Sequence, residues 1–358
     1  MLTGDASGYP NAAVPTGNSS PRGAVLGLGM IGRHHARLLQ ATERATFAGA
    51  VDPGGDRYGA VRDPERVFAS IDELLAREPL DFAIVSVPTE DHLSAAAALA
   101  SSGVAVLVEK PLAATSDEAR QIIAACERAG VPGAVGHVER FNPALLELRR
   151  RVRDGQLGDV FLIATERVGP FPDRVRDVGV VKDLATHDLD LVRWLGGAPI
   201  ERVAAQTQHR MGRPHEDLVL VTGALRSDVS FNIVVDWLSP TKVRRTRIPG
   251  ERGMLVADQL TADLTFYANG LVASEWSSTQ ALRGVSEGDM TRYALSRREP
   301  LLAELEAFLD LLAGVEDPGV VTLQEGLETV ICAEAVLASA AEGRTVVIGE
   351  AHAGATAG

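Results

Sequence analysis

The chain of 358 residues is poor in cysteine, in aromatic residues and in long apolar runs. Its two cysteines are too few for a disulfide framework or a zinc cage. We therefore expect Cys126 and Cys332 to be reduced thiols inside a core. No apolar run reaches the roughly 18 residues that a membrane-spanning helix needs. The N-terminus shows no basic region followed by an apolar one, so we expect no secretory signal and a cytoplasmic location.

Positive charge is also scarce. The 35 Lys and Arg residues stand against 48 Asp and Glu residues, for a net charge of −13, which argues against nucleic acid or an anionic membrane as a partner. The eight histidines form no H-x-x-x-H or H-E-x-x-H pattern, so we expect neither a metal site nor a metal-dependent hydrolase. An anionic substrate would have to be met by a local cluster of Arg or Lys.

The chain has enough apolar material for two domains, because 46% of its residues are hydrophobic and its length exceeds that of one ordinary core. Between residues 22 and 140, short apolar strands alternate with helices, the first of them expected over 30–40. This alternation predicts a parallel sheet covered by helices on both faces. We expect the ends, 1–21 and 346–358, to be flexible tails.

The pattern changes in the second predicted domain, 141–345. A helix is expected over 143–153, and β-branched strands such as 218–225 follow it. Several of these strands alternate apolar and polar residues, as a half-solvated antiparallel sheet does. Helices over 300–312 and 324–341 complete the segment. The sequence therefore predicts an α/β domain followed by an α+β domain.

A glycine-rich loop joins the first strand to the first helix, with the pattern G-x-G-x-x-G at Gly27, Gly29 and Gly32. The first glycine permits a tight turn, the second lets the backbone approach a diphosphate, and the third lets the helix pack on the strand. The diphosphate would then lie on free amides at the start of the helix, around Met30 and Ile31. This arrangement is typical of a dinucleotide-binding site.

Asp52 lies 20 residues after Gly32, at the end of the second strand. A carboxylate there accepts hydrogen bonds from the ribose hydroxyls of adenosine and repels a 2′-phosphate. The nearest basic residue in the sequence is Arg57. We therefore predict NAD rather than NADP as the cofactor. His34 and His35, which follow in the helix, are interpreted as surface or packing residues.

Two further motifs carry chemistry. Lys110 follows a buried strand within Glu109-Lys110-Pro111, at the sheet edge where ligands bind in open α/β folds; a solvated loop lysine is the alternative. Asp183 and His187 are four residues apart, which on a helix places both on one face. A histidine beside a carboxylate suits proton transfer at neutral pH, although Asp183 could instead cap a helix.

Together these motifs make the chain similar, over about 23–345, to the glucose–fructose oxidoreductase/inositol dehydrogenase (Gfo/Idh/MocA) family. The resemblance implies a Rossmann domain followed by an α+β domain with an open-faced, mostly antiparallel sheet. That sheet commonly forms the contact between subunits, so a homodimer or homotetramer is expected. The similarity rests on the glycine loop with Asp52, on Ser86-Val87-Pro88 with His92, on Glu109-Lys110-Pro111, and on Asp183-x-x-x-His187.

The resemblance also implies roles for single residues. Lys110 and His187 are expected to be the catalytic pair, with Asp183 beside them. We favour His187 as the base and Lys110 as the ammonium that polarises the alcohol oxygen, although the two roles could be exchanged. Further contacts with the cofactor are expected from Pro88, His92, Glu109 and Lys110.

The residues that would select a substrate give a weaker signal. Segments 136–143 and 237–245, with Gly253-Met254 and Asp258, are similar to members of the UDP-N-acetylglucosamine 3-dehydrogenase type. Such a member would oxidise C3 of a nucleotide-linked amino sugar with NAD. Lys110 and His187 would then contact the sugar. The further candidates for substrate binding are Arg140, Asn142, Lys242 and Arg244.

Alternation along a strand places Lys242 and Arg244 on one face and Arg245 on the other, so only one of these sets would face a given ligand. The basic residues could also simply face water or a neighbouring subunit. Two other functions stay open. The chain could be a dehydrogenase or ketoreductase for an inositol, a free or phosphorylated sugar or a deoxysugar nucleotide. More remotely, it could be a non-catalytic NAD-binding sensor, a class that usually loses the active-site Lys or His.

Overall fold

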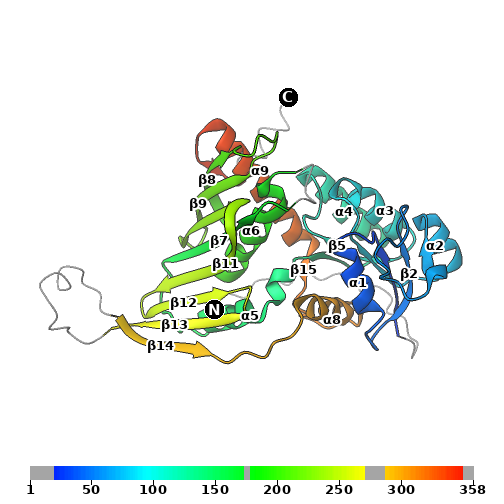
Figure 1. Ribbon diagram of the computed structural model, residues 1–358, viewed down its shortest axis with the longest axis horizontal. Coiled ribbons are helices and arrows are strands. Elements are labelled where there is room, and N and C mark those ends of the chain that lie inside the picture. The colour runs from blue at the N-terminus through cyan, green and yellow to red at the C-terminus, as the bar shows by residue number, and fades with distance from the viewer. Residues whose placement is uncertain (1–19, 173–177, 271–286, 350–358) are drawn as a thin grey trace, which may run out of the picture. The chain divides into compact units, whose positions relative to one another are not determined.

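The computed structural model describes residues 20–172, 178–270 and 287–349, which divide into two compact units (Figure 1). Unit 1 comprises Met1–His137 and Leu301–Val330, and unit 2 comprises Val138–Pro300 and Ile331–Gly358. Most of the expected N-terminal tail, 1–19, and the last residues, 350–358, lie outside the described residues.

Unit 1 is built on a seven-stranded sheet with the order β15-β6-β5-β4-β1-β2-β3. All neighbouring strands run parallel except β15, which pairs with β6 in the antiparallel sense. The predicted Rossmann architecture is thus confirmed. The strands are β1 (Arg22–Leu26), β2 (Thr46–Val51), β3 (Val67–Phe68), β4 (Phe82–Val85), β5 (Ala105–Glu109), β6 (Gly133–Gly136) and β15 (Val321–Thr322).

The helices of unit 1 cover both faces of this sheet: in Figure 1, α3 and α4 lie on one side of the strands and α1 and α8 on the other. Local sequence explains where several of them begin and end. Thr115 and Glu118 form a capping box at the start of α4, and Gly130 ends that helix in the left-handed conformation. The helices are α1 (Gly32–Leu39), α2 (Ile71–Arg77), α3 (His92–Ser101), α4 (Ser116–Ala129) and α8 (Pro300–Leu312).

The division into units differs from the predicted domain boundaries. The chain leaves unit 1 after His137 rather than at 140, and it comes back for Leu301–Val330. In that returning segment, Phe308 packs edge-on against Phe82 of β4, with ring centroids 5.8 Å apart, and Val321 pairs with Val135. The sequence shows that the 300–312 helix has an apolar face, but not which core that face covers.

Unit 2 contains a nine-stranded sheet with the order β14-β13-β12-β11-β7-β10-β9-β8-β16. Among its described neighbours β7 and β10 run parallel and the other pairs antiparallel, so the predicted mostly antiparallel sheet is confirmed. The strands are β7 (Leu162–Pro170), β8 (Ile200–Gln208), β9 (Leu218–Leu225), β10 (Ser230–Asp236), β11 (Leu238–Gly250), β12 (Gly253–Asp258), β13 (Asp263–Asn269), β14 (Glu287–Tyr293) and β16 (Val346–Val347).

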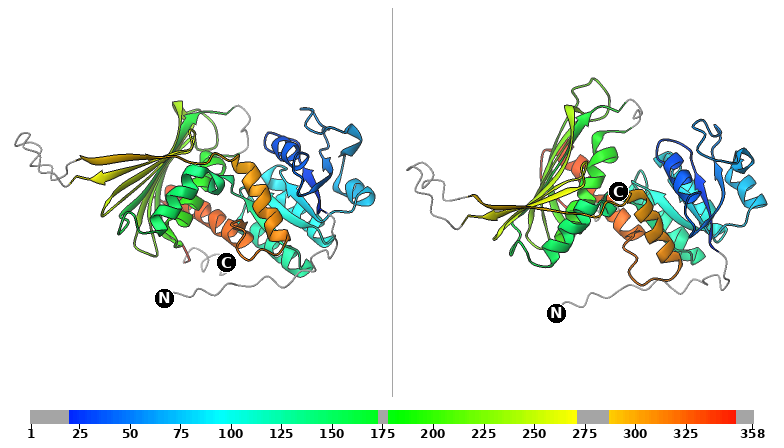
Figure 2. Two further views of the ribbon diagram at one scale, coloured as in Figure 1. Left: turned by 90° about the horizontal axis from the view of Figure 1, so that it is seen from below. Right: turned by 60° about the horizontal axis from the view of Figure 1, so that its bottom comes forward.

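Helices lie on one face of the unit 2 sheet (Figure 2). They are α5 (Pro143–Arg153), α6 (Thr186–Gly196) and the part of α9 (Leu323–Glu342) that belongs to unit 2. Their buried residues join those of the strands in one core that includes Leu145, Phe231 and Val336. In the described part of the unit, no helix covers the other face, which is therefore the open face.

Three expectations about the chain's ends and composition can now be compared with the structure. Residues 346 and 347 are not part of a tail, because Val346 is buried and pairs with Val203 of β8. Cys126 and Cys332 are free and buried, as expected, and burial raises the pKa of the Cys126 thiol to about 11. Within the described ranges, every helix is too short or too polar to cross a membrane.

Candidate active site

The glycine loop of unit 1 connects β1 to α1. Gly27 has φ +86°, and a Cβ there would lie 2.6 Å from the Ser86 carbonyl oxygen, so both backbone and space require glycine. A Cβ at Gly32 would overlap the Gly27 carbonyl oxygen. A Cβ at Gly29 would meet no described atom within 4 Å. Packing within the protein therefore explains the first and third glycines, whereas the second faces the space that a ligand would use.

The start of α1 has the properties of a diphosphate site. No side chain of the described residues caps this helix. The amides of Arg33 and His34 donate to the carbonyls of Gly29 and Ile31, so an anion would be met by the amides of the loop residues that precede them. Met30 and Ile31, which precede the helix, are 49% and 36% exposed. The loop is held in place by Ser86, whose hydroxyl donates to the carbonyls of Leu26 and Gly27. This geometry fits the diphosphate of NAD at the predicted residues.

Asp52 lies at the end of β2, where backbone amides hold its carboxylate. Oδ2 accepts a hydrogen bond from the amide of Leu28 at 2.8 Å, and Oδ1 accepts one from Gly54 at 2.8 Å. Each carboxylate oxygen can accept more than one hydrogen bond, so these contacts leave capacity for ribose hydroxyls. The sequence did not single out Arg33, whose guanidinium stacks over the Tyr58 ring at 4.6 Å in the loop beyond Asp52.

His92 links the loops that follow β4 and β5. Its Nε2 lies 3.1 Å from the Val87 carbonyl oxygen, and its Nδ1 lies 3.0 Å from that of Pro111. The ring is buried, and burial lowers the pKa of His92 despite the carbonyls around it. The ring nitrogens of His92 are thus occupied by backbone oxygens, so the residue positions the loops of Pro88 and Lys110. Its contact with the cofactor stays a prediction.

Lys110 directly follows β5 and is half-buried. Its backbone amide donates to Oε2 of Glu109 at 3.2 Å, while Oε1 of Glu109 receives a hydrogen bond from Nε2 of His35 at 2.7 Å. Glu109 and His35 are both buried. Sequence reasoning predicted that Glu109 contacts the cofactor but missed its bond to His35, because 74 residues separate the two. The residue type of His35 alone did not indicate that it would contact Glu109.

Unit 2 contributes Asp183 and His187. Asp183 belongs to the π-helical turn Val181–Ala185, and His187 lies in the first turn of α6. The two residues therefore span a junction rather than the regular helix that their spacing suggested, and π-helical turns recur at functional sites. Asp183 is buried and His187 half-buried. The N-cap of α6 is Ala185, so the alternative that Asp183 caps this helix is wrong.

A network of buried charges surrounds α6. Arg167 of β7 donates to Asp188 at 2.6 Å, to Glu139 at 2.8 Å and to Gln259 at 2.9 Å. Burial lowers the pKa of Arg167, but the charges of Asp188 and Glu139 outweigh burial and raise it overall. For Asp188, burial raises the pKa more than Arg167 lowers it. The network thus holds α6 against β7 through charge-assisted hydrogen bonds.

Two residues that we expected to bind substrate are occupied inside unit 2. Arg140 is buried and bonds both carboxylate oxygens of Asp190, at 2.7 and 2.5 Å. Asn142 caps α5 by accepting from the amide of Ala144 and donates to the Gln259 carbonyl. The polar atoms of these side chains thus serve the packing of unit 2, and their role in substrate binding stays a prediction.

Arg244 of β11 lies directly opposite Arg167 of β7 in the sheet register, so both side chains share the face that α6 covers. Its Nη1 donates to the carbonyls of Val168 and Val243, and no described carboxylate forms an ion pair with it. Burial and then the charge of Arg167 lower the pKa of Arg244 to about 10. The neighbouring Arg245 is exposed on the opposite face, as the alternation predicted.

Known proteins are similar in sequence to parts of both units. A family model described as "Oxidoreductase family, NAD-binding Rossmann fold" matches residues 22–137, and the "GFO/IDH/MocA C-terminal domain" matches 145–256. UDP-N-acetylglucosamine 3-dehydrogenase of Acidithiobacillus ferrooxidans is 30% identical over 299 residues, covering 82% of this chain and 88% of the relative. Myo-inositol dehydrogenase Hyg17 of Streptomyces leeuwenhoekii is 31% identical over 338 residues, covering 90% and 98%.

The fold is shared with solved structures as well. That of the UDP-N-acetylglucosamine 3-dehydrogenase GnnA from Acidithiobacillus ferrooxidans superimposes with a TM-score of 0.75 at 27% identity, covering 89% of this chain and 97% of that one.

Proposed function

The chain belongs to the GFO/IDH/MocA oxidoreductase family, and from this premise we propose that it oxidises C3 of a nucleotide-linked amino sugar such as UDP-N-acetylglucosamine. The coarser activity follows from the family itself: the protein is an NAD-dependent oxidoreductase that acts on CH–OH groups. Bound NAD supplies the hydride acceptor.

One observation carries the choice of a nucleotide sugar. Arg244 is a half-buried cation that is hydrogen-bonded to carbonyls but lacks an ion-paired carboxylate among the described residues. In a protein of net charge −13, such a cation is a favourable site for an anion, and guanidinium binds phosphate oxygens well. The exposed Lys242 adds a second positive charge on the same strand. The relative that acts on UDP-N-acetylglucosamine supports the same choice.

Three side chains divide the chemistry in this proposal. His187 accepts the proton of the substrate hydroxyl as its carbon gives up a hydride. Lys110, as an ammonium, donates a hydrogen bond to the same oxygen and stabilises the alkoxide character that develops there. Asp183 orients this pair and favours the charged state of Lys110. The hydroxyl becomes a ketone, with its proton on His187 and its hydride on the cofactor.

A specific observation also favours a second candidate, the oxidation of an inositol or another polyol. The myo-inositol dehydrogenase relative is 31% identical and is covered over 98% of its length. The same three catalytic residues would serve this reaction, but Arg244 would then have no anionic group to bind. A non-catalytic sensor is disfavoured, because the chain retains Lys110, Asp183 and His187.

We also propose that the protein forms a homodimer or homotetramer through the open face of the unit 2 sheet. Exposed apolar side chains on its strands support this proposal, among them Leu220, Tyr267 and Met290, which are 42%, 41% and 65% exposed.

The test of the substrate is NADH formation with a panel of UDP-N-acetylglucosamine, its uronic acid, a deoxysugar nucleotide, glucose 6-phosphate and myo-inositol. Turnover confined to the nucleotide sugars is expected. Arg244→Ala should raise KM for a nucleotide sugar about tenfold, since a charge-assisted hydrogen bond is worth about 1.5–3 kcal/mol, and should leave KM for any free sugar that reacts nearly unchanged. Arg245→Ala, on the opposite face, is the matched control. Turnover of inositol alone would favour the second candidate.

A further inference from the structure

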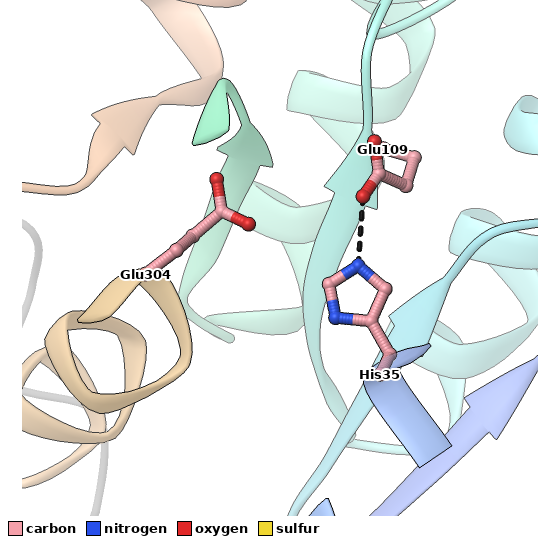
Figure 3. A group of neighbouring side chains, drawn as sticks. All are labelled: His35, Glu109 and Glu304. Carbon is pink, nitrogen blue, oxygen red and sulfur yellow. Dashed lines mark hydrogen bonds and ion pairs between the residues drawn. The ribbon is translucent and has the colours of Figure 1, made fainter. Parts of the chain in front are cut away.

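A buried cluster in unit 1 combines residues from three distant parts of the chain (Figure 3). His35 comes from α1, Glu109 from the end of β5 and Glu304 from α8. One nitrogen or oxygen atom of each lies within 4.8 Å of the other two. His35 and Glu304 are each 1% exposed and Glu109 is 8% exposed. The cluster thus places two acids and one histidine together with almost no exposure to solvent.

The two acids of the cluster have different surroundings. Glu109 accepts hydrogen bonds from His35 and from the Lys110 amide. Glu304 extends from α8 toward them (Figure 3), yet neither of its buried carboxylate oxygens has a hydrogen-bond partner among the described residues. Ionised carboxyl groups are rarely buried without a partner, because burial removes the water that stabilises their charge and nothing compensates for that loss. The surroundings of Glu109 therefore favour an ionised carboxylate, and those of Glu304 favour a protonated, neutral acid.

The neighbouring charges shift the pKa values of the two acids in opposite directions. Burial raises the pKa of Glu109, but the hydrogen bond and charge of His35 and the charge of Lys110 outweigh burial and hold it below its ordinary value. Burial and the charge of Glu109 raise the pKa of Glu304 well above 4.5. His92, from α3, is a further titratable group that interacts with Glu109. The two acids thus titrate far apart, as neighbouring carboxyl groups do.

A metal ion fits these residues less well than a proton. A carboxylate only accepts hydrogen bonds, so His35 donates to Glu109 through Nε2. Binding a cation through that nitrogen would break this bond, and the burial of the cluster leaves little room for the waters that complete the shell of a hard ion. A proton on Glu304 neutralises the second acid without these costs.

We propose that Glu304 is a buried carboxylic acid that leaves Glu109 as the single carboxylate of the cluster and so positions Lys110. Glu304 acts through Glu109, which binds the Lys110 backbone, and His35 supports Glu109 from the other side. Both are positioning residues. The effect on Lys110 rests on the function proposed above, whereas the protonation of Glu304 does not.

The first test uses unfolding of the full-length protein and needs no substrate. Because Glu304 holds its proton more tightly when folded than when unfolded, wild-type stability falls as pH rises above 4.5 toward the raised pKa. Glu304→Gln keeps the shape and is always neutral. Its Tm should therefore rise relative to wild type as pH rises. Asp310→Asn is the matched control on the same helix, where an exposed carboxylate pairs with Arg44, and should show no such gain.

The second test is the pH profile of kcat with the reacting sugar. At neutral pH Glu304→Gln should stay within about twofold of wild type, because it preserves the neutral state. At alkaline pH wild type should lose activity as Glu304 ionises beside Glu109, and Glu304→Gln should lack that loss. A Tm difference that does not change with pH, or an alkaline loss that persists in the variant, would overturn the proposal.

Metal analysis of wild type and Glu304→Gln completes the design. One divalent ion per chain in wild type that is lost in the variant would show that the cluster binds a metal and would overturn the proposal that Glu304 is protonated. Equal metal content in the two proteins supports the proposal. If no sugar reacts but the Tm difference widens with pH, the proposed function fails while the protonation of Glu304 stands. If sugars react but the Tm difference stays constant with pH, the proposed function stands and the protonation of Glu304 fails.

Discussion

The two units bury charge in opposite ways. In unit 1, Glu109 and Glu304 meet a histidine, and no arginine is bonded to either carboxylate in the described residues. In unit 2, buried acids such as Asp188 and Asp190 are bonded to guanidinium groups at 2.7 Å or less. Arginine remains charged at every physiological pH, whereas a proton on a carboxyl group depends on pH. The comparison shows how a pH-dependent charge and a permanent one can occur in one chain.

The largest effect is expected at Lys110, the residue that the unit 1 cluster serves. Lys110→Ala should reduce kcat by about 10³-fold or more, because it removes the group that stabilises charge on the substrate oxygen. NADH binding, followed by fluorescence, should persist, since the glycine loop and Asp52 are unchanged. Lys110→Arg serves as the comparison that keeps the charge. Retained turnover in the alanine variant would remove Lys110 from the mechanism.

The permanent charges of unit 2 are tested at Arg167. Arg167→Met keeps most of the volume but leaves Asp188 and Glu139 without their cation, which should cost about 3–5 kcal/mol of unfolding free energy. Denaturant unfolding of the variant measures this loss. The loss of unfolding free energy should be smaller at acid pH, where the carboxyl groups of Asp188 and Glu139 take up protons. Equal destabilisation at all pH values would show that packing rather than charge explains the role of Arg167.

A smaller effect is expected at the cofactor end of unit 1. Asp52→Ala should weaken NAD binding about tenfold, because it removes hydrogen bonds to the ribose worth about 1.5 kcal/mol. It should also relax the discrimination against NADP, whose 2′-phosphate the carboxylate repels. The measurement is kcat/KM for both cofactors. Asp52→Asn separates charge from shape, and an unchanged NAD to NADP ratio in both variants would contradict our interpretation of Asp52.

The sequence predicted well what depends on neighbouring residues. The strand expected over 218–225 and the helix over 300–312 have the observed bounds. Hydrophobic periodicity is a local property, so it locates such elements. The glycine loop could be predicted equally well, because the turn at Gly27 and the helix contact at Gly32 are close in the chain.

Contacts between distant residues could not be predicted in this way. Arg140 and Asp190 are 50 residues apart, and a basic residue in a candidate substrate segment gives no sign that its partner is buried beside it. Glu304 looks like any acid of an amphipathic helix until the fold brings α8 to β5. The first helix was expected from residue 30 but begins at Gly32, because helix propensity does not mark where a loop must remain open for a ligand.

The return of Leu301–Val330 to unit 1 has a consequence for how the protein is made. Unit 2 is in effect an insertion between β6 and the last elements of a Rossmann domain. On the ribosome, the strands up to β6 emerge first, but Glu304 and the edge strand β15 follow only after more than 160 intervening residues. Domains tend to fold as their chain is completed. The first unit to emerge must therefore wait for nearly the whole chain before its edge strand and its buried cluster can form.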